Sequence, residues 1–269
     1  MRLFVVPIFK NHWGYHCQTS VLPSGRLARW VDYASTKWEG LSAAKPNSWK
    51  FRLYTSGSNL MDKIDYHEWF LKSVPPRNPV EDRGRMPVIC PATLDTDEVQ
   101  TKLTHLITQR KPYHQRYLTL SCLWLPLSLA FSLVPLVPNV FLFYNLFRVY
   151  SHYRAYQGAD HLLWLLHNNQ VDFTGTDPIF QAREALFRVT DEDPLSVASI
   201  HQLSHELDMP LLEVNLLRAH NQILDRASEA GEYTPSTDGD SAIDVHSHPP
   251  SPSSGSPPLD SVDPDKKKV

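Results

Sequence analysis

The longest hydrophobic stretch of the chain covers residues 117–147 and contains no Lys, Arg, Asp, Glu or His. A straight helix of this length would measure about 46 Å, against a hydrocarbon core of about 30 Å, and two complete spans would need roughly 40 residues plus a turn. Pro135 and Pro138 interrupt its middle. The pattern therefore predicts a helical hairpin with these prolines in the turn and with Asn139 capping the second helix.

Shorter patterns on either side predict further elements. Residues 1–20 contain two segments that predict short strands, RLFVVPIF and HWGYHCQTS. Apolar residues at helical spacing predict amphipathic helices near residues 27–38, 60–74 and 95–111, and further helices within 171–227. Residues 77–92 are rich in proline and charge and predict a loop. Gly158 is expected to allow close helix packing or a bend.

These elements predict a mainly α, membrane-associated protein divided into four regions. Residues 1–116 form a basic, mostly helical region with short N-terminal strands, and residues 117–168 form a membrane hairpin with its amphipathic continuation. Residues 169–227 form a small soluble helical region. Residues 228–269 are rich in Ser, Pro, Asp and Gly. They cannot bury enough apolar area to offset the loss of chain entropy, so we expect a disordered acidic tail.

The distribution of charge favours a membrane location for the hairpin. No carboxylate occurs between Glu98 and Asp160, although basic residues lie on both sides of the uncharged stretch. Carboxylates are costly in lipid, and flanking basic residues are typical of segments that face the negative side of a membrane. A buried hairpin in a soluble helical domain explains the prolines but not the missing acids. We therefore expect a hairpin that spans the membrane, with a re-entrant or in-plane hairpin as the alternative.

Polar residues follow the hydrophobic stretch at helical spacing. Asn145, Arg148 and His152 share one face of the predicted second helix, with Tyr144 and Arg154 nearby. Within a bilayer, Arg148 and His152 would be functional candidates, because ionisable groups are costly there and an imidazole titrates near neutral pH. At the headgroups they would be anchors that reach lipid phosphates, and this second interpretation is favoured. Anionic membrane lipids are accordingly the expected partner.

The sequence lacks recognisable motifs for catalysis, cofactors or metals. No H-E-x-x-H, G-x-S-x-G, Walker A or G-x-G-x-x-G motif occurs, and the three cysteines are far apart. We therefore predict a protein that is not an enzyme and that holds neither cofactor nor metal. Residues 196–226 have the outline of a helix-turn-helix but lack a basic footprint. Nucleic-acid binding is consequently the least favoured function.

Both ends of the sequence carry weak targeting signals. The first 31 residues contain basic residues but no acid, as mitochondrial transit peptides do. The C-terminal KKKV resembles a dilysine retrieval signal, which makes the endoplasmic reticulum the alternative location.

Three stretches resemble the mitochondrial K+/H+ exchange-related proteins, a family of inner-membrane proteins of fungi and animals. They are MRLFVVPI at the start, LMDKIDYHEWFLKSVPP at residues 60–76 and PNVFLFYNLFRVYSHYRAYQGADHL at residues 138–162. The resemblance covers roughly residues 1–225. Its most specific block comprises Pro138, Asn139, Tyr144, Phe147, Arg148, Ser151, His152, Arg154, Ala155 and Gly158. It implies a location in the mitochondrial inner membrane and a part in exchanging matrix K+ for H+. In that membrane, the basic residues on both flanks of the hairpin predict termini that face the matrix.

The residues favour an auxiliary role within that function. A cation antiporter usually keeps a carboxylate inside the membrane to bind K+ or H+, and the uncharged stretch has none. One hairpin is also too small to line a pathway, so a homo-oligomer or other inner-membrane subunits are expected. The favoured function is a subunit or auxiliary factor of K+/H+ exchange rather than a complete carrier. The alternative is a membrane-bound structural or adaptor protein that recruits a partner.

Overall fold

The computed structural model describes residues 1–19, 63–77, 84–132, 140–173, 178–182 and 193–233, with single positions between 45 and 61 and between 187 and 190. All the elements below belong to one compact unit, Met1–Ser236. The helices are α3 (Tyr66–Ser73), α4 (Thr96–Ser132), α5 (Val140–His167), α6 (Pro178–Ala182), α7 (Val197–Glu206) and α8 (Pro210–Glu229).

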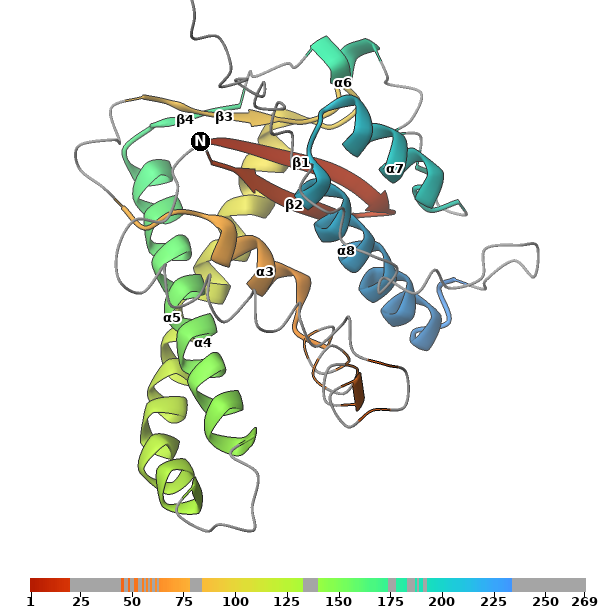
Figure 1. Cartoon of the computed structure of the whole chain (residues 1–269). Helices are drawn as coiled ribbons and strands as arrows, with labels where there is room; N and C mark the ends of the chain where they lie inside the picture. The colour runs from red at the N-terminus through yellow and green to blue at the C-terminus, as the bar shows by residue number, and fades with distance from the viewer. Residues whose placement is uncertain are drawn as a thin grey trace, which may run out of the picture. The chain divides into compact units, whose positions relative to one another are not determined.

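A four-stranded sheet lies between the helices (Figure 1). β1 (Arg2–Phe9) and β2 (His12–Gln18) form an antiparallel hairpin, and Lys10 in its turn has a φ of 46°. β1 also pairs in parallel with β3 (Met86–Ile89), which pairs in parallel with β4 (Val171–Asp172). The strand order is therefore β2-β1-β3-β4.

β1 is buried on both faces, because its successive side chains point into two different cores. Leu3 and Val5 pack with apolar residues of α3, α4 and α5. Phe4, Val6 and Ile8 pack with apolar residues of α6, α7 and α8. The continuous apolar run at the start of the chain is thus that of a strand covered by helices on both sides.

The long helices α4 and α5 form a hairpin that packs on the sheet at one end and extends away from it at the other (Figure 1). The packed part contributes one stripe from each helix, in which buried residues recur every three or four positions. These are Val99, Leu103 and Ile107 of α4 and Ala155, Ala159 and Leu162 of α5.

Gly158 sets the distance between α5 and α3. A Cβ atom at this position would overlap the backbone carbonyl oxygen of Leu71 and would lie 3.1 Å from Cβ of Val74. Backbone atoms cannot move aside as a side chain does, so only glycine lets the two helices approach this closely. The expected close packing at Gly158 is confirmed.

The prediction of a mainly α fold is wrong, because the structure is a mixed α/β fold built on the four-stranded sheet. The strands β1 and β2 lie where two short strands were expected. β3 lies within residues 77–92, which were predicted as a loop. It has four residues, one of them Pro87, and its pairing with β1 joins segments that are far apart in the sequence. A local pattern cannot reveal such a pairing.

The prediction of a transmembrane hairpin is also wrong. Among the described residues, no helix is both long enough and apolar enough to cross a membrane. The uncharged stretch is divided: residues 117–132 belong to α4 and residues 140–147 to α5, and each part is shorter than the roughly 20 residues of a span. Charged residues occupy the remainder of both helices. The predicted turn and cap, Pro135, Pro138 and Asn139, lie outside the described residues, as does the predicted helix near residues 27–38.

Candidate functional site

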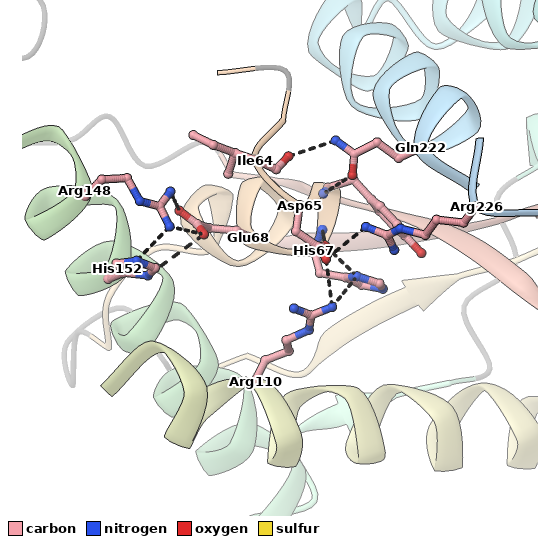
Figure 2. A network of polar contacts seen from close by, with 10 residues as sticks. Ile64, Asp65, His67, Glu68, Arg110, Arg148, His152, Gln222 and Arg226 are labelled. Carbon is pink, nitrogen blue, oxygen red and sulfur yellow. Dashed lines mark hydrogen bonds and ion pairs between the residues drawn. The ribbon is translucent and has the colours of Figure 1, made fainter. Parts of the chain in front are cut away.

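Two carboxylates at the start of α3 organise a network of polar contacts inside the unit (Figure 2). Asp65 is the N-cap of α3, and its Oδ1 accepts a hydrogen bond of 2.9 Å from the backbone N–H of His67. Glu68 follows in the first turn, where the helix dipole favours a negative charge. The two side chains point to different neighbours, so each forms a cluster of its own.

The Glu68 cluster consists of Glu68, His114, Arg148, Ser151 and His152. Glu68 is only 3% exposed, and its Oε1 accepts hydrogen bonds of 2.6 Å from Ser151 Oγ and 3.0 Å from Arg148 Nη1. Nη2 of Arg148 lies 3.4 Å from Oε2, which completes a two-pronged contact. Burial alone would raise the pKa of Glu68, but the Ser151 hydrogen bond and the charge of Arg148 outweigh it, and the pKa is lowered. Glu68 is therefore a buried carboxylate with its counter-charge in place.

Arg148 also fixes the positions of the imidazole protons. Its Nη2 lies 2.7 Å from Nε2 of His152, and because a guanidinium only donates, Nε2 must accept. The His152 proton is then on Nδ1, which lies 3.1 Å from Nδ1 of His114 and donates to it. His114 consequently carries its proton on Nε2, a buried atom with no hydrogen-bond partner among the described residues.

Both histidines of this cluster are held in the neutral form. Burial lowers the pKa of His114 to about 4. Burial, followed by the charge of Arg148, lowers the pKa of His152 to about 4. At neutral pH the cluster therefore contains one negative charge, one positive charge and two neutral imidazoles.

The same cluster has the residue types of a metal site. One donor atom each from Glu68, His114 and His152 lie within 4.8 Å of one another, and two imidazoles with a carboxylate are a common ligand set. Arg148, however, bonds both Glu68 and His152, and it places a proton on the His152 nitrogen that would face the ion. In this arrangement the guanidinium supplies the positive charge that a metal would otherwise bring.

The Asp65 cluster joins α3 to α4 and α8. Asp65 Oδ2 accepts from Arg110 of α4 at 3.0 Å and from Arg226 of α8 at 3.3 Å. Nδ1 of His67 lies 2.8 Å from Oδ1. Burial alone would raise the pKa of Asp65, but the hydrogen bond and charge of His67 and the charge of Arg110 lower it well below its usual range.

Gln222 of α8 also belongs to this cluster and forms hydrogen bonds with the backbone at the start of α3. It accepts from Tyr66 N–H at 3.0 Å and donates to the Ile64 carbonyl at 2.9 Å. Together the two clusters tie α3 to α4, α5 and α8, and they hold the base of the α4/α5 hairpin in place.

The far part of the α4/α5 hairpin differs sharply from this base. We call residues 120–130 of α4 and 141–147 of α5 the hairpin end. Its large apolar side chains are exposed, with Leu123 at 70% and Phe143 at 67%. The others are Leu120, Trp124, Leu127, Leu129, Phe141, Tyr144 and Leu146.

A polar contact lies between the helices of the hairpin end. Nδ2 of Asn145 donates to Oγ of Ser128 at 3.0 Å, and this hydroxyl donates to the carbonyl of Trp124 at 2.9 Å. Ser128 is only 8% exposed. The hairpin end thus has a polar pair between its helices, while most of its large apolar side chains are exposed.

A family described as mitochondrial K+–H+ exchange-related matches residues 2–166. The match includes the sheet strands β1 to β3, the whole Glu68 cluster and the hairpin end. The chain belongs to this family. Its description points to mitochondria and to a role related to K+/H+ exchange.

Two fungal proteins are similar to the chain. The uncharacterized protein C23H3.12c of Schizosaccharomyces pombe is 25% identical over 207 residues, which cover 75% of this chain and 90% of that protein. The uncharacterized protein YDL183C of Saccharomyces cerevisiae is 35% identical over 80 residues, which cover 30% of this chain and 25% of that protein. No solved structure matches the chain.

The residues singled out in the family-like block at 138–162 occupy three different environments. Arg148 and His152 lie against Glu68 inside the protein, with His152 only 1% exposed. Asn145 lies in the seam of the hairpin end, and Tyr144 is exposed on its surface. Arg154 donates to the backbone carbonyl of Lys72 at 3.3 Å.

The sequence did not reveal Glu68 and His114 of the first cluster, nor Asp65 and its partners in the second. Glu68 and Asp65 lie in an amphipathic segment, where charged residues ordinarily face solvent. His114 lies in a basic, aromatic stretch with no ligand spacing. Two signals were available in the family-like stretches. The stretch at residues 60–76 contains Asp65 and Glu68, and the block at 138–162 contains the arginine and histidine that contact Glu68.

Proposed function

We propose that this member of the family is an accessory component of mitochondrial K+/H+ exchange that binds the surface of the inner membrane through its hairpin end. Family membership supports the mitochondrial location and the link to K+/H+ exchange. The polarity of the hairpin end supports attachment to lipid. In this proposal the hairpin end enters the headgroup region and the upper acyl chains without crossing the bilayer.

The observation that carries this proposal is the exposure of large apolar side chains at the hairpin end, beside a polar pair between its helices. Two helices that pair in water place apolar residues between them and polar residues outside. Here Asn145 and Ser128 bond to each other between the helices, while Leu123 and Phe143 face outward. Between residues 119 and 130 most positions of α4 are exposed, so apolar groups lie on several sides of the helix. Lipid chains can surround such a surface, whereas one protein face would cover only part of it.

Exposed aromatic residues with polar tips lie between the hairpin end and the sheet. Tyr113, Tyr117 and Tyr153 are 40%, 41% and 42% exposed. Trp124 lies within the hairpin end and is 58% exposed. Tyrosine and tryptophan favour the boundary between lipid and water because one part of the ring system is apolar and another forms hydrogen bonds. The tyrosines therefore lie where the lipid–water boundary would be if only the hairpin end entered the membrane.

The state of the buried carboxylates supports an accessory role rather than a complete carrier. An exchanger needs an acid that is free to take up K+ and H+ in turn. Asp65 and Glu68 each bond to arginines, and the pKa of each is lowered. Neither is suited to gain and lose a proton near neutral pH. We therefore assign ion movement to other inner-membrane subunits or to a larger assembly that contains this chain.

Swelling of isolated mitochondria in K+ acetate tests this function. Mitochondria that lack the protein should swell more slowly, and re-expression of the wild-type chain should restore the rate. The variant Leu123→Gln/Phe143→Gln should fail to restore it, because it removes apolar contacts with lipid.

The matched control is Leu211→Gln, which alters an equally exposed leucine (71%) on α8, away from the hairpin. This variant should restore swelling fully. A normal swelling rate in mitochondria without the protein would contradict a role in K+/H+ exchange. Full rescue by the Leu123→Gln/Phe143→Gln variant would contradict attachment through the hairpin end.

A further inference from the structure

A group of basic side chains surrounds Lys72 where the hairpin end meets α3. Lys72 lies in the last turn of α3, and its Nζ is 3.7 Å from the ring centre of Trp69 and 5.2 Å from that of Phe147. Phe147 is the last residue of the hairpin end. Arg154 of α5 reaches the Lys72 carbonyl, and the guanidinium of Arg218 of α8 lies 4.3 Å from the Trp69 ring centre. We call Lys72, Trp69, Phe147, Arg154 and Arg218 the Lys72 site.

The Lys72 site has an excess of positive charge. The charges acting on Lys72 are those of Arg218, Arg148 and Arg154, together with one carboxylate, Glu68. Glu68 is already engaged by Arg148 and Ser151. Burial, and then the three arginines, lower the pKa of Lys72 to about 8 in spite of Glu68. Like charges crowded in this way are stabilised by an anion.

Among the described residues, the aromatic and backbone groups beside Lys72 and Arg154 carry no net negative charge. Aromatic faces attract an ammonium group through their quadrupole but carry no net charge. The carbonyl end of α3 carries a partial negative charge, and one of its oxygens takes a single hydrogen bond from Arg154. A guanidinium has five donors, and among the described residues this is the one hydrogen bond that Arg154 forms, so further donors can serve a ligand. The indole N–H of Trp69 is a further buried donor with no partner among the described residues.

We propose that the Lys72 site binds a phosphate group through Lys72 and Arg154, with Arg218 adding positive charge. Phosphate oxygens accept charge-assisted hydrogen bonds from ammonium and guanidinium groups. The site begins at Phe147, where the apolar surface of the hairpin end stops. When acyl chains surround the hairpin end, the headgroup phosphate of the same lipids lies at the depth of the Lys72 site. The expected source is therefore an anionic phospholipid, and a soluble phosphate compound is the other source of the same chemistry.

This inference deepens the proposed function and rests on it for the lipid source alone. Its test is flotation of the full chain with vesicles of phosphatidylcholine and with vesicles of equal parts phosphatidylcholine and phosphatidylglycerol. The wild-type chain should bind the mixed vesicles more tightly. Lys72→Gln and Arg154→Gln should each weaken binding to the mixed vesicles about fivefold and leave binding to phosphatidylcholine unchanged.

Arg116→Gln is the matched control, because it removes one positive charge from an exposed position of the same hairpin. It should weaken binding to the mixed vesicles by less than about twofold. Lys72→Arg, which keeps the charge, should bind like the wild type. Equal losses for Lys72→Gln and Arg116→Gln would mean general attraction to a charged surface and would overturn the site. Failure of the wild-type chain to bind either vesicle would count against the membrane proposal instead.

A second measurement uses the unaltered protein and identifies the source of the phosphate. Amine-selective labelling with peptide mapping is carried out in inorganic phosphate and in chloride of equal ionic strength. If the site binds phosphate from solution, labelling of Lys72 should fall in phosphate while that of the exposed Lys63 stays constant. Protection by mixed vesicles but not by inorganic phosphate would assign the site to lipid headgroups. No protection of Lys72 by either would overturn the proposal.

Discussion

The two parts of the α4/α5 hairpin differ in which side chains they bury and which they expose. Its base buries charge: Glu68 and His152 are 3% and 1% exposed and are joined to Arg148 by hydrogen bonds. Its end exposes apolar surface, with Leu123 and Phe143 about two-thirds exposed or more, and keeps the polar pair Asn145 and Ser128 in the seam. The base therefore holds the hairpin to α3, whereas the end is free to make contacts outside the chain.

This difference separates folding from binding along a single pair of helices. Changes at the base should affect the free energy of unfolding, because buried charges and close backbone contacts depend on their exact partners. Changes at the end should leave stability almost unaltered, because its large side chains are exposed already. Each of the following variants tests one side of this contrast.

Glu68→Gln should produce the largest loss of stability. It leaves the guanidinium of Arg148 without its counter-charge in a partly buried site, and breaking a buried pair in this way typically costs about 3–5 kcal/mol. Chemical denaturation with urea measures the loss. Glu98→Gln is the control, because Glu98 pairs with Lys102 on the surface at 46% side-chain exposure and should cost less than about 1 kcal/mol. Similar losses for both variants would show that the Glu68 cluster does not hold the base.

Gly158→Ala should destabilise the same base by about 1–3 kcal/mol, because the added methyl group meets the Leu71 carbonyl. Ala159→Gly, next in the helix, loses a buried methyl group instead and serves as a comparison. If Gly158→Ala were as stable as the wild type, α5 could not be as close to α3 as the structure places it.

Lowering the pH should destabilise the base of the α4/α5 hairpin before it affects the hairpin end. The pKa values of His114 and His152 are lowered to about 4 by burial, whereas unfolded histidine titrates near pH 6.5. Between these values the unfolded chain binds more protons than the folded chain, so stability falls as the pH falls. Each histidine contributes up to about 1.4 kcal/mol per pH unit in this window. Urea titrations between pH 7 and pH 4.5 measure the slope.

His114→Gln should reduce this slope, whereas substitution of the exposed His12 by Gln should not. The slope does not vanish in His114→Gln, because His152 remains and because burial also lowers the pKa of His16 to about 4. An unchanged slope in His114→Gln would show that this imidazole is protonated in the folded protein.

Leu123→Gln should have the smallest effect on folding, within about 0.5 kcal/mol of the wild type. The leucine side chain is already 70% exposed, so little burial is lost. Thermal unfolding in the absence of lipid measures the change. A loss of several kcal/mol would mean that the hairpin end is buried against the rest of the protein.

The parts of the fold that the sequence predicted are those that depend on local pattern. β1 and β2 follow from two short apolar runs, and a pair of helices follows from the uncharged stretch at residues 117–147. The length of α4 was not predicted, because residues 95–111 were expected to form a separate helix. The shared face of Asn145, Arg148 and His152 follows from their spacing of three and four residues. Close helix packing, one of the two outcomes expected at Gly158, follows from the absence of a Cβ atom in glycine.

The parts that the sequence missed depend on contacts between distant segments. β3 joins the sheet only because β1 lies beside it, and Pro87 makes its segment resemble a loop. Glu68 is buried only because Arg148 and Ser151, some eighty positions later, supply hydrogen bonds and charge. The uncharged stretch was predicted to span a membrane because it lacks carboxylates and has basic residues on both sides. In the structure each of its two parts is shorter than a span.

Flotation of the purified chain with phosphatidylcholine vesicles tests the central claim most directly. The hairpin end is proposed to bind lipid through its exposed apolar side chains, so the wild-type chain and Leu211→Gln should float with the vesicles. Leu123→Gln/Phe143→Gln should remain in the unbound fraction while staying folded. Equal flotation of all three proteins, or none by the wild type, would contradict the account.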